Sequence, residues 1–184
     1  MDSLKFFREA IRDIKTSGTI FPSSRFLSRR IVNNIDFSKV NVIVEFGPGN
    51  GIITKEILKR IQPQTKLIAF EINEKFVESL GKIKHSQLFL EKASAEDITS
   101  ILKKHGYDKA DCIISSLPLT NIPTEISDRI LDNSYDAMAK GSLFVQYQYS
   151  LTYYKKLKEV FRDEVKLSFE AFNIPPAFVY IAKK

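Results

Sequence analysis

The sequence has little that would support metal, disulfide or membrane-spanning chemistry. Its 184 residues include one cysteine, Cys112, and two histidines, so an internal disulfide is excluded and no metal-ligand spacing is present. Charged residues interrupt every hydrophobic stretch before it reaches a membrane-spanning length. Residues 1–20 also lack the continuous apolar core of a signal peptide. We therefore expect a cytoplasmic protein without a metal site.

The composition predicts one basic domain. No repeat, linker or low-complexity segment divides residues 1–184, and 43% hydrophobic residues are enough to build a core. The 28 lysines and arginines outnumber the 22 acidic residues, which gives a net charge of +6. Such an excess favours a polyanionic partner, either nucleic acid or an anionic lipid surface, and does not choose between them.

Three glycines follow a strand predicted over residues 42–46: Gly47, Gly49 and Gly51. A backbone without Cβ atoms can approach a ligand closely, and open parallel sheets bind ligands at the carboxyl ends of their strands. A second predicted strand, residues 66–71, ends in Glu71, where a carboxylate can accept both hydroxyls of a ribose. The two features together predict a site for a ribose-containing cofactor.

The spacing of the glycines excludes two common nucleotide-binding loops. Ile52 stands where a dinucleotide loop, Gly-x-Gly-x-x-Gly, needs its third glycine, and no Gly-Lys-Ser/Thr is present to form a P-loop. The pattern Glu-x-Gly-x-Gly-x-Gly over residues 45–51 instead resembles motif I of class I S-adenosylmethionine-dependent methyltransferases. The resemblance implies S-adenosylmethionine as the cofactor. It assigns Glu45 to the loop and the methionine end, Glu71 to the ribose, and Ala95 and Glu96 to the adenine.

Strands and helices alternate along the predicted chain. The expected strands cover residues 42–46, 66–71, 87–91, 111–115 and 142–147, and the expected helices cover 51–61, 73–82, 97–104, 123–139 and 151–161. Residues 165–172 and 177–181 predict a closing hairpin, and Gly141 is expected just beyond a helix end. Alternation of this kind predicts an α/β doubly wound parallel sheet. The resemblance implies the seven-stranded Rossmann-like sheet of class I methyltransferases, with an antiparallel C-terminal hairpin and preceding N-terminal helices.

The loop after the fourth predicted strand, Ser115–Leu119, should face the transferred methyl group, because it follows a strand at the same carboxyl edge. It resembles the Asn-Leu-Pro-Tyr motif of ribosomal RNA adenine-N6 methyltransferases, in which an amide and a carbonyl hold the amine and the aromatic ring stacks on the base. The resemblance places Ser115 beside the cofactor, and Ser116 and Leu117 beside the reacting nitrogen. Leu119 replaces the aromatic residue, and it cannot supply stacking of about 1–3 kcal/mol per base. This difference counts against a base as the acceptor.

A closer resemblance covers nearly the whole chain. Residues 16–27 resemble the Thr-Gly-x-x-x-Pro-Ser-Ser-x-x-Leu segment of bacterial phospholipid N-methyltransferases. The match continues in Ser-Leu-Pro-Leu at 116–119, Gln-Tyr-Gln-Tyr at 146–149 and Pro-Pro-Ala-Phe-Val-Tyr at 175–180. The resemblance implies methylation of a phosphatidylethanolamine-type amine. It places Ser23 and Arg25 near the cofactor carboxylate or the lipid phosphate.

Methyl transfer to an amine depends mainly on proximity and orientation. A phenol can take part in removing the amine proton, and its ring can hold the growing quaternary ammonium by cation–π attraction. Tyr149 is the first candidate for this role and Tyr147 the second. Alternation along a strand puts both on one face, where either could instead serve only as core packing.

The N-terminal segment adds a membrane hypothesis. Residues 3–15 have apolar side chains at helical spacing, bordered by Lys5, Arg8, Arg12 and Lys15. Such a helix lies at an anionic membrane interface or packs its apolar stripe on the domain, and residues 1–35 form a helical lid or a membrane-contact segment. The first reading implies a peripheral protein at the inner membrane face.

Three functions remain open. The sequence favours N-methylation of a phospholipid head group. An RNA adenine-N6 methyltransferase would use the basic charge to bind phosphates, but it needs the stacking that Leu119 lacks. A catalytically silent, cofactor-binding regulator is disfavoured, because Glu45, Glu71 and the 115–119 loop are all intact.

Overall fold

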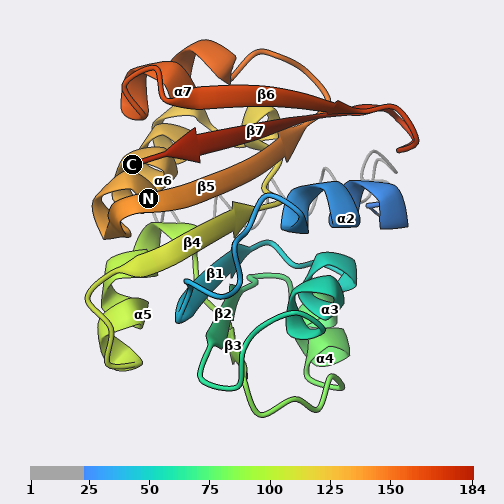
Figure 1. Cartoon of the computed structure of the whole chain (residues 1–184), viewed down its shortest axis with the longest axis vertical. Helices are drawn as coiled ribbons and strands as arrows, with labels where there is room; N and C mark the ends of the chain where they lie inside the picture. The colour runs from blue at the N-terminus through green and yellow to red at the C-terminus, as the bar shows by residue number, and fades with distance from the viewer. Residues whose placement is uncertain (1–22) are drawn as a thin grey trace.

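The computed structural model describes residues 23–184; the predicted amphipathic helix over residues 3–15 lies outside them. The described chain forms a seven-stranded sheet in the order β3-β2-β1-β4-β5-β7-β6 (Figure 1). Strands β1 to β5 run parallel, and β7 pairs antiparallel with both β5 and β6. The predicted doubly wound sheet with an antiparallel C-terminal hairpin is therefore confirmed. The strands are β1 (Val42–Phe46), β2 (Lys66–Phe70), β3 (Leu88–Glu91), β4 (Ala110–Ser115), β5 (Met138–Gln148), β6 (Val165–Glu170) and β7 (Ala177–Lys183).

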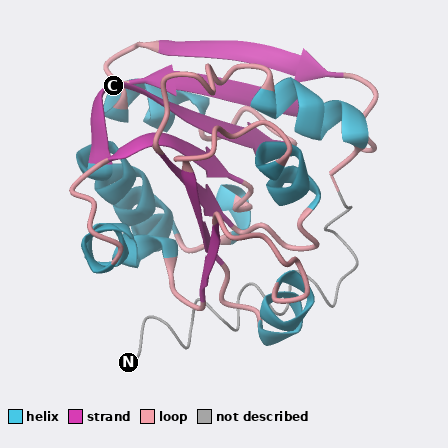
Figure 2. Cartoon of the chain, turned by 60° about the horizontal axis from the view of Figure 1, so that its bottom comes forward, coloured by secondary structure: helices cyan, strands magenta, loops and turns pink. Residues whose placement is uncertain are grey.

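Helices cover both faces of the sheet (Figure 2). They are α2 (Arg25–Val32), α3 (Ile52–Leu58), α4 (Glu74–Leu80), α5 (Ile98–Lys104), α6 (Thr124–Ala137) and α7 (Tyr154–Val160), with the short 3₁₀ turns η1 (Ala95–Asp97) and η2 (Leu119–Asn121). None of these described helices is long and apolar enough to cross a membrane.

Every residue of β1 is buried, because this central strand is covered on both sides. Val44 and Phe46 pack in a core with α5, α6 and α7, whereas Ile43 packs in a second core with α2 and α3. Alternate side chains of a strand point to opposite faces, so one short strand contributes to both cores. The sheet is thereby held rigidly, and the carboxyl ends of its strands form a fixed edge.

The junction between α6 and β5 differs from the prediction. Helix α6 ends at Ala137 and β5 begins at the next residue, so Gly141 lies inside β5 and is not a glycine just beyond a helix end. Gly141 has a φ of +85°, and the pairing register shifts between Ala110 and Cys112 on the neighbouring strand. The register pairs Ala110 with Met138 and Cys112 with Leu143, so β5 carries several extra residues at this irregularity, and glycine tolerates its left-handed backbone conformation. The prediction was wrong because the same residue type serves both kinds of site.

Candidate active site

The glycine loop after β1 is tied directly to the end of β2. Glu71 is 4% exposed, and its carboxylate accepts hydrogen bonds from the backbone N–H of Gly49 at 3.2 Å and of Ile72 and Asn73 at 2.9 Å each. A carboxylate offers about four acceptor positions, so Glu71 keeps capacity for a ligand hydroxyl. The predicted acid and the predicted loop therefore lie together at one edge of the sheet.

Two of the loop glycines fill crowded positions, and the third leaves open space. Gly47 and Gly51 have φ values of +64° and +76°, and a Cβ atom would lie 3.1 Å from Leu117 Cδ2 at Gly47 and 3.0 Å from Leu80 Cδ2 at Gly51. At Gly49, which has a φ of +57°, the nearest atom to such a Cβ would be the Gly47 carbonyl at 3.9 Å. A left-handed backbone without a side chain permits close approach of a ligand here.

Glu45 is fully buried in β1, and neither of its carboxylate oxygens has a hydrogen-bond partner. Burial, together with the nearby Glu71 carboxylate, raises the pKa of Glu45 to about 8, although the neighbouring Thr54 lowers it. A buried carboxylate is stabilised in its charged form by a neighbouring cation. Glu45 therefore fits a ligand that brings a positive group to this edge, such as the ammonium of S-adenosylmethionine.

Further unpartnered polar atoms lie close to this edge. Among the described residues, the other buried side-chain atoms without a partner are Thr54 Oγ1, Ser116 Oγ and Gln146 Oε1. Buried polar groups are normally hydrogen-bonded, so a cluster of orphaned atoms marks a place where a polar ligand can complete the network. The cluster and the open backbone at Gly49 fit the predicted cofactor.

The residues predicted to line the adenine, Ala95 and Glu96, lie in the η1 turn, which contacts α6. Ala95 is 4% exposed and packs in the core that contains α5 and α6. The Glu96 carboxylate accepts a hydrogen bond from Arg129 Nε at 2.9 Å, and the amide of Asn133 donates to the Glu96 carbonyl at 2.9 Å. Helix α6 therefore holds this turn in place. The role of Ala95 and Glu96 toward the adenine stays a prediction.

The loop after β4 is fixed by its backbone carbonyl at Leu117. This oxygen accepts hydrogen bonds from the side-chain amides of Gln146 at 2.9 Å and Gln148 at 2.8 Å, and from the backbone N–H of Leu119 at 2.9 Å. The backbone N–H of Leu117 donates to Ser115 Oγ at 3.4 Å. A carbonyl has two lone pairs, so this one has no capacity left for an incoming amine without rearrangement.

Leu119 is fully buried and packs in the core beside α6. Its side chain therefore forms no surface against which an acceptor could stack. The substrate contact predicted for Leu119 is not visible in this conformation and stays a prediction.

Tyr147 and Tyr149 lie together at the end of β5, as their alternation predicted. Their ring centroids are 5.9 Å apart at an interplanar angle of 72°, and Ser23 Oγ donates a hydrogen bond to the Tyr147 hydroxyl at 3.1 Å. Burial raises the pKa of Tyr147 to about 12 and also raises the pKa of Tyr149. Both phenols keep their protons near neutral pH, which favours a binding role over that of a base. Tyr149 is the more accessible ring, at 37% exposed against 9% for Tyr147.

Of the two residues predicted from the N-terminal motif, Ser23 reaches the tyrosine pair. Arg25 begins α2, is exposed, and forms no ion pair with another described residue. Its predicted contact with cofactor or lipid phosphate stays a prediction.

Asn173 was missed by the sequence analysis. It is 1% exposed, its Oδ1 accepts a hydrogen bond from the Ser24 N–H at 2.9 Å, and its Nδ2 donates to the Pro175 carbonyl at 2.7 Å. It thereby joins the start of α2 to the β6–β7 loop beside Tyr149. A polar residue before a proline pair is a weak signal. Gln146 and Gln148, whose amides hold the Leu117 carbonyl, were also given no role by the sequence analysis. Two glutamines in the otherwise apolar end of β5 are a stronger signal than a polar residue before a proline pair.

Comparisons with known proteins agree with this geometry. The family model described as ribosomal RNA adenine dimethylase matches residues 15–158. An ornithine lipid N-methyltransferase of Singulisphaera acidiphila is 30% identical over 181 residues, which cover 97% of this chain and 92% of that protein. A ribosomal RNA small subunit methyltransferase A of Mycoplasma mycoides is 35% identical over 140 residues, which cover 74% of this chain and 50% of that protein.

Among solved structures, a SAM-dependent methyltransferase of Archaeoglobus fulgidus matches with a TM-score of 0.65 at 17% identity. The match covers 85% of this chain and 92% of that chain, and it shows a shared fold.

Proposed function

Because this chain belongs to the family of ribosomal RNA adenine dimethylases and related lipid N-methyltransferases, we propose that it methylates the amine of a phospholipid head group, of the phosphatidylethanolamine type. The family and the fold establish an S-adenosylmethionine-dependent N-methyltransferase. The acceptor is the part that we propose.

The strongest support comes from the 115–119 loop. Leu119 is buried in the core, and the Leu117 carbonyl already accepts three hydrogen bonds from Gln146, Gln148 and Leu119. The aromatic platform on which the adenine enzymes stack a base is therefore missing, whereas the occupied Leu117 carbonyl restricts any incoming amine equally. The similarity to the ornithine lipid enzyme, which runs along 92% of that protein, is consistent with a lipid acceptor.

The cofactor residues would act by binding and orientation. S-adenosylmethionine, when bound, supplies an electrophilic methyl group. Glu71 would hold the ribose, the backbone at Gly49 would allow close approach, and Glu45 would face the cationic methionine end. With the cofactor held there, Ser115 and Ser116 border the space where the amine must arrive. Alignment of this kind can contribute about 7–11 kcal/mol to a reaction of two bound groups.

The acceptor must arrive as a neutral amine. A lipid ammonium has a pKa near that of lysine, about 10.4, and transfer out of water lowers it. Tyr147 and Tyr149 do not act as the base, because burial raises the pKa of both phenols. The proton therefore leaves to solvent as the head group is desolvated, and Tyr149 holds the methylated ammonium against its ring face.

We also propose that the enzyme works at an anionic membrane surface, as a peripheral protein of the inner face. The net charge of +6 supports this, since basic residues near an anionic surface each contribute about 1 kcal/mol. Deletion of residues 1–15, which lie outside the described residues, should weaken co-sedimentation with vesicles if the predicted helix is interfacial. Unchanged co-sedimentation would assign that segment a structural role.

An RNA adenine-N6 methyltransferase is the second candidate. The family model that matches residues 15–158 favours it, and the basic charge would serve to bind phosphates. It requires a surface on which the base can stack, and the buried Leu119 does not supply one.

The test is a methyl-transfer assay with labelled cofactor. Purified protein is incubated separately with phosphatidylethanolamine-containing vesicles and with ribosomal RNA, and the lipids are separated by chromatography. We expect label in mono- or polymethylated phosphatidylethanolamine. Label in RNA and none in lipid would overturn the proposal.

A further inference from the structure

The β6–β7 loop presents two large apolar side chains to solvent from a fixed backbone. Phe172 is 74% exposed and Ile174 is 79% exposed, whereas Asn173 between them is 1% exposed. The Asn173 side chain is held by the Ser24 N–H at 2.9 Å and by the Pro175 carbonyl at 2.7 Å. The buried amide therefore fixes the loop in a conformation that turns both apolar neighbours outward.

A third exposed apolar side chain joins them from the other end of the sequence. Phe26 in α2 is 55% exposed, and its ring centroid lies 5.6 Å from that of Phe172. Single exposed apolar residues are ordinary on protein surfaces, but contiguous groups mark interaction sites. We call Phe26, Phe172 and Ile174 the apolar rim.

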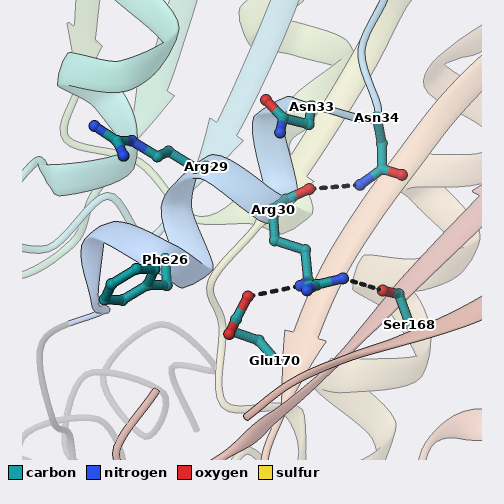
Figure 3. Close-up of a pocket in the computed structure, with 7 residues that line it drawn as sticks. All are labelled: Phe26, Arg29, Arg30, Asn33, Asn34, Ser168 and Glu170. Carbon is teal, nitrogen blue, oxygen red and sulfur yellow. Dashed lines mark hydrogen bonds and ion pairs between the residues drawn. The ribbon is translucent and has the colours of Figure 1, made fainter. Parts of the chain in front are cut away.

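Basic side chains flank the apolar rim on α2. Arg30 is bound to the Glu170 carboxylate at 2.6 Å and to Ser168 Oγ at 3.1 Å, at a groove of about 310 Å³ that Phe26 also lines (Figure 3). Arg29 points away from that pair in the same view. Arg25 and Arg29 are exposed and form no ion pair with another described residue. Two exposed arginines without a direct ion pair among residues 23–184 therefore lie beside the exposed apolar group, although Arg29 is near enough to Glu56 to help lower the pKa of that carboxyl.

The apolar rim lies at the active-site edge of the sheet. Figure 1 shows the β6–β7 loop and the first turn of α2 at the edge where β4 and β5 end. Asn173 also lies close enough to Tyr149 to lower its pKa against the larger effect of burial. The loop that carries these exposed apolar residues therefore contacts the ring assigned to the acceptor through Asn173.

We propose that the apolar rim inserts into the interfacial region of an anionic bilayer, with Arg25 and Arg29 at lipid phosphates, so that Tyr149 faces the head groups. The inference rests on the proposed lipid acceptor and adds a membrane contact within the described residues. An apolar group with a basic border is the pattern of interfacial segments. A two-fold contact between copies through this face would bring the same cations together, which disfavours a dimer.

The chain has no tryptophan, so one substitution gives a single-fluorophore protein. Phe172→Trp reports on the apolar rim. Leu167→Trp is the matched control: Leu167 is 41% exposed in β6, where alternation turns it away from the face on which Ser168 and Glu170 meet α2. On addition of vesicles of phosphatidylethanolamine and phosphatidylglycerol, we expect the tryptophan fluorescence of Phe172→Trp to shift to the blue and to be quenched by brominated acyl chains. The fluorescence of Leu167→Trp should show neither change. Absence of both changes, or equal changes in the two variants, would overturn the inference.

The second measurement is partition into the same vesicles. Phe172→Asp combined with Ile174→Asp should weaken partition by about tenfold or more, because two apolar side chains lose their place in the interface. Leu167→Asp should stay within about twofold of the wild-type protein. The inference would be overturned if the double variant partitioned into vesicles like the wild type. It would also be overturned if sedimentation showed that the substitutions only dissociate a dimer.

Failure of the acceptor proposal gives a different pattern. On a short-chain phosphatidylethanolamine below its micellar concentration, the double variant should lose far less activity than it loses on vesicles. If the wild-type protein methylates neither lipid form while Phe172→Trp still shows the blue shift, the acceptor proposal fails and the membrane contact stands.

Discussion

The two halves of the active-site edge are built in different ways. On the cofactor side, Glu71 binds Gly49, which lies 22 residues earlier, and the two residues that follow it in the chain. On the acceptor side, Gln146 and Gln148 reach back 29 and 31 residues to Leu117, and Ser23 reaches 124 residues forward to Tyr147. The cofactor half is one strand-loop-helix-strand unit, whereas the acceptor half is assembled by tertiary packing.

This difference teaches where specificity resides. A compact local unit can be kept for one cofactor while the distant residues around it change. The two sides meet where the Ser116 N–H donates to the Phe46 carbonyl at 2.9 Å and where a Cβ atom at Gly47 would come within 3.1 Å of the Leu117 side chain. Variants on the cofactor side should therefore change cofactor affinity, and variants on the acceptor side should change turnover.

The largest expected effect is on the cofactor side. Glu71→Ala should weaken S-adenosylmethionine binding by about tenfold to a hundredfold, because hydrogen bonds to a charged group contribute about 1.5–3 kcal/mol. Calorimetric titration measures the affinity, and Glu78→Ala, an exposed acid on α4, is the control. Unchanged affinity in Glu71→Ala would remove the ribose assignment.

Tyr149→Ala should reduce turnover on lipid by about tenfold, since loss of a cation–π contact removes about 0.5–2 kcal/mol. Tyr147→Phe, which keeps the buried ring and loses the hydroxyl that bonds Ser23, should stay within about twofold. Initial rates on mixed vesicles give the comparison. The reverse order would assign the acceptor contact to the Tyr147 hydroxyl and not to the Tyr149 ring.

A smaller effect on kcat, without an effect on cofactor affinity, distinguishes the acceptor side from the cofactor side most clearly. Gln148→Leu removes one of the amide donors to the Leu117 carbonyl and should lower kcat by about threefold, as expected for one neutral hydrogen bond. Its affinity for S-adenosylmethionine should equal that of Gln64→Leu, a change at an exposed position. A parallel loss of cofactor affinity would show that the halves are coupled.

A separate prediction concerns stability in the absence of cofactor. Burial raises the pKa of Glu45 from an ordinary 4.5 to about 8, so the folded chain holds a proton that the unfolded chain has released between these values. The free energy of unfolding should therefore fall as pH rises through this window and level off above it. Glu45→Gln should remove the fall attributable to Glu45 and raise Tm at pH 8 by about 4 °C or more.

Thermal unfolding at pH 5, 6.5 and 8 measures this difference, with Glu78→Gln as the control. Equal pH dependence in the wild type and Glu45→Gln would show that Glu45 is ionised in the empty protein.

Much of the fold and the cofactor side could be predicted from the sequence, because both follow from local patterns. Buried strands alternate with helices, and the glycines and Glu71 lie within one such unit. Gly141 was misassigned because a bulge in β5 depends on pairing with β4. Asn173 was missed because its partner Ser24 lies 149 residues away. The buried position of Leu119 likewise depends on packing against α6, which no short pattern encodes.

A direct competition between acceptors tests the central claim, that the acceptor side is shaped for a lipid amine. One reaction contains labelled S-adenosylmethionine, phosphatidylethanolamine–phosphatidylglycerol vesicles and ribosomal RNA, and the label in each fraction gives the ratio of kcat/KM for the two acceptors. We predict that lipid carries nearly all of the label and that Tyr149→Ala lowers the lipid signal without raising the RNA signal. A ratio in favour of RNA would contradict the account.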